Sequence, residues 1–113
     1  MKPVLLDTGV IVSLLDSSEH HHLACIEAIE SCAAPLVTCE AVIGESCCLL
    51  RKQRGAAERI LENVANGAFQ IPFQLASGAR QIQRILRRYH DREVDLADAC
   101  LIHMASELRS GKS

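Results

Sequence analysis

The chain has 113 residues, of which 49% are apolar and 23% are charged, and its formal net charge at pH 7 is −2. This length predicts a single domain over residues 1–113, and the net negative charge excludes a general electrostatic attraction to nucleic acid, although local basic patches can supply one. No apolar run approaches the roughly 20 residues of a membrane-spanning helix, so the composition predicts a soluble protein that is not embedded in a membrane.

Short β-rich runs alternate along the chain with segments of helical periodicity. The first run ends at Asp7, after which apolar residues recur with helical spacing. Ser17 and Ser18 are predicted to cap the second helix, and Thr38 to cap a long, mostly buried third helix. The predicted strands are residues 4–6, 35–37 and 68–71, and the predicted helices follow Asp7 and cover residues 19–31, 39–51, 56–65, 74–89 and 95–108. This alternation predicts a short parallel sheet with helices on both faces, a three-layer α/β/α fold.

Two of the acidic residues occupy positions that need an explanation. Asp7 directly follows the first strand, at the carboxyl edge where parallel sheets place their ligands, but an aspartate there is also a common helix cap. Glu45 interrupts an otherwise apolar helix face, so its carboxylate needs a partner, and a salt bridge to an arginine is the simpler choice. Glu40, in the first turn of the same helix, is predicted to be a solvated charge.

Asp95 and Asp98 open the last predicted helix, one turn apart, in "DLADACLIHMASE". A helix cap explains Asp95 well, whereas Asp98 is predicted to point toward the core because the apolar face begins at Ala99. If Asp98 converged with Asp7 and Glu45, their repulsion would disfavour the charged forms unless a divalent cation neutralised them. Carboxylate oxygens without convergent His or Cys favour Mg²⁺ or Mn²⁺ over Zn²⁺.

At these positions the chain resembles the PIN domain family, especially the VapC-like toxin ribonucleases. The segment "VLLDTGVIVSLLD" resembles the opening strand and first acid of that family, and "DLADACLIHMA" resembles its later acidic helix. The resemblance implies a Mg²⁺- or Mn²⁺-dependent endoribonuclease that hydrolyses RNA with a metal-activated water. It implies catalytic and metal-binding roles for Asp7, Glu45 and Asp98, and a supporting role for the Thr8 hydroxyl. It also implies a cognate antitoxin protein that blocks the site.

The family continues after this helix into another strand and a further acidic segment, whereas this sequence stops at Ser113. We therefore expect a PIN-like fold without its C-terminal strand, with Asp95 as a possible substitute for the further acid. The open sheet edge invites pairing with a second copy, so a homodimer is expected. An alternative function is a noncatalytic PIN-like module that binds protein or RNA. A third is a structural α/β interaction domain, which requires arginine partners for Glu45 and Asp98.

Two basic groups are candidates for RNA contact, although a merely solvated face explains either equally well. They are Arg51, Lys52 and Arg54, and Arg80, Arg84, Arg87 and Arg88. The six cysteines form no C-x-x-C pair and lie mostly in apolar helical patterns, which predicts reduced thiols. Because Asp7 interrupts the first apolar run, we expect no export signal and a cytoplasmic location.

Overall fold

The computed structural model describes residues 2–110, and in this part strands and helices alternate as predicted. The elements are β1 (Val4–Leu5), α1 (Thr8–Leu15), α2 (His22–Glu30), β2 (Leu36–Val37), α3 (Glu40–Leu49), α4 (Ala56–Ala65), β3 (Phe69–Gln70), α5 (Leu75–Arg88) and α6 (Leu96–Arg109). The predicted α/β class is confirmed. Among the described helices, none combines the length and apolar character needed to cross a bilayer.

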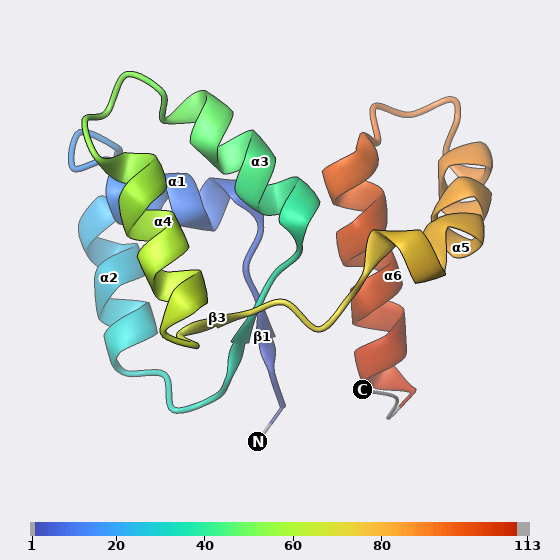
Figure 1. Cartoon of the computed structure of the whole chain (residues 1–113), viewed down its shortest axis with the longest axis horizontal. Helices are drawn as coiled ribbons and strands as arrows, with labels where there is room; N and C mark the ends of the chain where they lie inside the picture. Colours follow the sequence, from blue (N-terminus) through green and yellow to red (C-terminus); the bar gives the residue numbers. More distant parts are fainter. Residues whose placement is uncertain (1, 111–113) are drawn as a thin grey trace.

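The three strands form a parallel sheet in the order β1-β2-β3. Figure 1 shows α1, α2 and α4 on one side of the sheet, α5 and α6 on the other, and α3 across its upper end between the two groups. The backbone N–H groups of Val4 and Leu6 donate to the carbonyls of Pro35 and Val37, at 2.8 Å each. Because successive residues of a strand face opposite edges, the N–H and C=O groups of Leu5 point to the open edge of β1.

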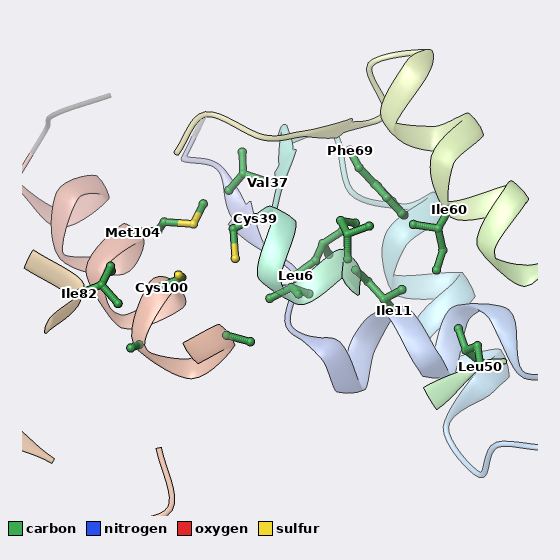
Figure 2. Packing of buried hydrophobic residues seen from close by; sticks show 14 of the residues in the cluster. Leu6, Ile11, Val37, Cys39, Leu50, Ile60, Phe69, Ile82, Cys100 and Met104 are labelled. Atoms are coloured by element: carbon green, nitrogen blue, oxygen red, sulfur yellow. The ribbon is translucent and has the colours of Figure 1, made fainter. Parts of the chain in front are cut away.

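Apolar side chains from both helical layers meet on the sheet and form one core. Leu6, Ile11 and Ile60 lie on the side of α1 and α4, and Cys100 and Met104 come from α6 (Figure 2). All are at most 4% exposed. A buried aliphatic side chain contributes about 1.5–3 kcal/mol by leaving water, so this cluster is the main force that holds the layers together.

The second helix begins later than predicted, and its predicted cap is wrong. Helix α2 starts at His22, and the side chain of its first flanking residue, His21, makes no capping hydrogen bond. The Ser18 N–H and hydroxyl instead donate to Oδ1 of Asp16, at 3.0 and 2.6 Å. These two hydrogen bonds hold the pKa of Asp16 below its usual value of 3.8. Ser18 therefore closes a turn after α1, which delays the next helix.

Thr38 was predicted to cap α3, and this is also wrong. Cys39 occupies the capping position, without a side-chain hydrogen bond, and the helix ends at Leu49 instead of residue 51. The fully buried Thr38 hydroxyl donates to the carbonyl of Leu6 at 3.0 Å, while its N–H donates to Gln70 at 2.9 Å. Thr38 thus links the ends of all three strands. Its hydroxyl gives a partner to the carbonyl of Leu6, the residue before Asp7, which would otherwise be buried without one.

Candidate metal centre

Asp7 lies at the carboxyl edge of the sheet, at the point where β1 gives way to α1. It is the N-cap of α1, and its Oδ1 accepts a 2.9 Å hydrogen bond from the N–H of Val10. The capping role, which the sequence left open as an alternative, is therefore observed. The side chain is exposed, and Oδ2 accepts no hydrogen bond from any residue between 2 and 110. Asp7 can cap its helix through one oxygen and offer the other to a ligand.

Glu45 projects from the middle of α3 toward the start of α1. The Thr8 hydroxyl donates a 2.7 Å hydrogen bond to its Oε1, and both side chains are half-buried. The salt bridge to an arginine that the sequence left open is not formed, because the one ion pair within residues 2–110 joins His103 and Glu107 at 3.6 Å. Glu45 is therefore held by Thr8, the residue that follows Asp7, and it forms no ion pair with a Lys, Arg or His side chain in the described part.

Asp95 and Asp98 form a reciprocal capping box at the start of α6. Oδ1 of Asp95 accepts from the N–H of Asp98 at 2.9 Å, and Oδ2 of Asp98 accepts from the N–H of Asp95 at 3.2 Å. This confirms the predicted cap. Asp98 is exposed, however, so the expectation that it points toward the core is wrong. A negative charge near a helix N-terminus is stabilised there by the helix dipole, which explains an exposed position without core contacts.

Helix α3, which carries Glu45, packs against both α1 and α6, at whose starts Asp7 and Asp98 lie. Each of Asp7, Glu45 and Asp98 uses one carboxylate oxygen for a hydrogen bond and keeps the other without a protein donor in the described part. Free carboxylate oxygens are the ligands that Mg²⁺ and Mn²⁺ prefer, so the donors fit such an ion in kind. No three His, Cys, Asp or Glu side chains among residues 2–110 are gathered closely enough to form a ready-made metal group.

Sequence reasoning missed Ser46, which neighbours Glu45 on α3. Its side chain is fully buried, and its Oγ has no hydrogen-bond partner in the described structure. A buried hydroxyl without a partner costs about 1–3 kcal/mol. A serine inside a mostly apolar helix gives no signal in the sequence that separates this state from a satisfied one.

The first basic group, Arg51, Lys52 and Arg54, lies exposed in the connection between α3 and α4. The Arg51 guanidinium donates to the carbonyl of Cys48 at 2.9 Å, so it also satisfies the last turn of α3. Because this connection follows α3, which carries Glu45, the group lies at one end of the same helix as an acid of the candidate site.

The second basic group lies along α5 and consists of Arg80, Arg84, Arg87 and Arg88. All four are exposed. By the helical period Arg80, Arg84 and Arg87 occupy the face opposite the buried Gly78 and Ile82, and Arg88 lies at the flank of the buried face. Since α5 packs on α6 through the buried face, the first three arginines face away from α6 and its acids. The two basic groups are therefore not equivalent in their relation to the candidate site.

A hollow with a volume of about 450 Å³ lies between the sheet and the α5–α6 pair. Its lining includes Val37, Phe73, Gly78, His103 and Met104. A Cβ atom at Gly78 would collide with the Phe73 ring, so a larger residue there would require this ring to shift. None of the candidate acids lines this hollow, which separates it from the proposed metal ligands.

Two comparisons with known proteins give matches that extend over most of the chain. The family model described as PIN domain matches residues 4–111. The chain is also similar to a protein named Ribonuclease VapC26 from Mycobacterium tuberculosis (strain ATCC 25618 / H37Rv), with 29% identity over 109 residues. That alignment covers 95% of this chain and 81% of the relative.

Proposed function

We propose, from the premise that this chain belongs to the PIN domain family, that it is a divalent-metal-dependent endoribonuclease of the VapC-like toxin type. Membership in the family rests on a match over nearly the whole chain, and the relative of this chain is named a ribonuclease. The metal dependence, the ligand set and the substrate are the parts that we add.

The observation that supports the site best is the hydrogen bond from Thr8 to Glu45. It orients the half-buried Glu45 carboxylate toward Thr8, which directly follows Asp7. An acid on another face of α3 would not lie near Asp7. Orientation of a ligand by a second residue is typical of metal sites. We infer that Glu45 and Asp7 supply oxygens to one cation and that Asp98 supplies a third, with Asp95 as a further candidate.

In this proposal the chain's own groups position the cation and the RNA. Asp7 and Asp98 are held by their capping hydrogen bonds, while their second oxygens have no side-chain or backbone donor in the described part. When bound, Mg²⁺ or Mn²⁺ neutralises charge on the scissile phosphate and activates water for attack on phosphorus. Arg51, Lys52 and Arg54 are the preferred contacts for the RNA backbone, because they follow the helix that carries Glu45. The four α5 arginines are weaker candidates, because three of them face away from α6.

The partners follow from the same assignment. We propose that RNA is the substrate, that a cognate antitoxin protein blocks the acidic site, and that the chain forms a homodimer. The open edge of β1, where the backbone groups of Leu5 have no partner among residues 2–110, supports self-association. All six cysteines are free thiols, which supports a reducing location such as the cytoplasm.

Metal binding tests the proposal more directly than cleavage. Mn²⁺ and Mg²⁺ should raise the melting temperature of the wild type, and Asp7→Asn, Glu45→Gln or Asp98→Asn should remove that rise, because a ligand that binds only the folded state stabilises it by mass action. The matched control is Glu40→Gln, an exposed acid in the first turn of the same helix as Glu45, which should leave the metal response unchanged. RNA cleavage is then measured with and without EDTA.

The noncatalytic PIN-like binding module is the second candidate function. It is favoured by one observation, that the described residues contain no three donors already gathered for one ion. If neither cation shifts the melting temperature of the wild type and no RNA is cut, the nuclease proposal is abandoned for this one. Binding of RNA or of a protein without cleavage would then be its direct support.

A further inference from the structure

Two buried cysteines from distant parts of the sequence meet between α3 and α6. Cys39 is the N-cap of α3 and Cys100 lies in the first turns of α6, and each is 1% exposed. Both side chains line one small hollow, so the two thiols lie close to each other. Figure 2 shows both side chains at the junction between the start of α3 and α6. The other four cysteines are half-buried or exposed.

A small hollow of about 240 Å³ reaches this pair from the surface. Both cysteines line it, together with Glu40, Ala41 and Phe73, and its remaining lining consists of Leu75 and Leu96. Leu75 and Leu96 are 37% and 43% exposed, so the hollow has an accessible rim. Both thiols are otherwise covered, so this hollow is the route by which a small thiol reagent would reach them.

We propose that Cys39 and Cys100 form a reversible disulfide when the protein meets a small disulfide such as oxidised glutathione. One cysteine sulfur attacks the small disulfide and displaces one glutathione thiol, and the second cysteine sulfur then attacks the mixed disulfide and displaces the other. The two protein thiols lose two electrons and two protons, and the small disulfide gains them. Disulfides in reducing compartments are typically of this transient, redox-responsive kind.

The location of the pair gives the bond a structural consequence. The α5–α6 pair packs on the rest of the protein mainly through α3 and α6, so a disulfide there ties the two helical layers covalently. It also closes a long loop of chain, which lowers the entropy of the unfolded state. Asp98 stands two residues before Cys100, and the bond would restrict how far α6 can move from α3. The inference itself does not depend on nuclease activity.

The experiment uses the full chain, reduced and then treated with oxidised glutathione. Free thiols are blocked with N-ethylmaleimide, and the products are mapped by mass spectrometry without reduction. The expected result is a peptide in which Cys39 is linked to Cys100, with the loss of two hydrogen atoms, reversed by dithiothreitol. The oxidised protein should melt at least about 5 °C higher than the reduced protein.

Cys100→Ser should abolish the intramolecular link, whereas Cys48→Ser, at an exposed position, should preserve it. The wild-type peptide map decides the matter alone if Cys100→Ser fails to fold. Only glutathione adducts, or links that join other cysteines, would overturn the proposal. An unchanged melting temperature in protein shown to carry the Cys39–Cys100 link would overturn its structural consequence.

Discussion

The hydroxyl of Thr8 donates a 2.7 Å hydrogen bond to Oε1 of Glu45, across 37 positions of the sequence. This contact joins the first turn of α1 to the middle of α3 and gives a half-buried carboxylate a fixed direction. Thr8 therefore does more than accompany the preceding acid. It orients the carboxylate of Glu45, and the first prediction follows from this role.

Thr8→Val should weaken Mn²⁺ binding by roughly 10–100-fold, because a second residue that orients a metal ligand typically contributes that much affinity. It should cost only about 1 kcal/mol of folding stability, the net value of one ordinary hydrogen bond. Metal titrations followed by thermal melting measure both effects. Thr8→Ser keeps the hydroxyl and should restore most of the binding. Unchanged Mn²⁺ affinity in Thr8→Val would contradict the orienting role.

Ser46→Ala should leave the free energy of unfolding unchanged or raise it, by up to about 1 kcal/mol. The reason is that the fully buried Oγ has no partner in the described structure, and alanine favours the helix more than serine does. Urea unfolding with an unchanged slope checks this. Ser13→Ala, at another buried serine, is the comparison. A loss above about 1 kcal/mol in Ser46→Ala would mean that the hydroxyl is satisfied, for example by a water.

The third prediction concerns alkaline pH. Burial, followed by the neighbouring Cys39 thiol, raises the pKa of Cys100 from its usual value of 9.0 to about 11. The contribution of this thiol to stability is fully present below pH 9 and is lost as pH rises through about 11, because the unfolded state gives up its proton first. The melting temperature of wild type should therefore fall more steeply over this range than that of Cys100→Ala. Cys48→Ala should follow wild type, and parallel curves for wild type and Cys100→Ala would refute the coupling.

The fourth prediction concerns self-association through the open edge of β1. Val4→Lys places a charge on this edge, where Val4 is 39% exposed, and lysine on an edge strand opposes pairing with another chain. We expect a dimer for wild type and a monomer for Val4→Lys by light scattering over a wide concentration range. The control is Leu23→Lys on α2, where the leucine is 73% exposed, and this variant should remain a dimer. A monomeric wild type at every concentration would reject the homodimer.

The local elements of this protein follow closely from its sequence. Helical periodicity and turn residues predicted every strand and helix of the described part, with ends displaced by a few residues. The caps at Asp7 and Asp95 were also predictable, because an N-cap interacts with backbone groups only two or three residues away. The failure at Ser17 and Ser18 has the same local origin. Asp16 competes for the Ser18 donors, and the resulting turn takes the place of the predicted cap.

The contacts that build the candidate site required the tertiary structure. Thr38 resembles a helix cap in the sequence, yet its hydroxyl bonds to Leu6, a partner that only strand pairing brings near. In the same way, packing of α3 between α1 and α6 decides that Thr8 contacts Glu45 and that Cys39 and Cys100 line the same hollow. Periodicity tells which face of a helix is buried, but not which distant residue lies opposite. The sequence by itself therefore determined the fold class and pointed to the candidate acids Asp7, Glu45 and Asp98. The packing of helices that are distant in the sequence decided which residues these acids contact.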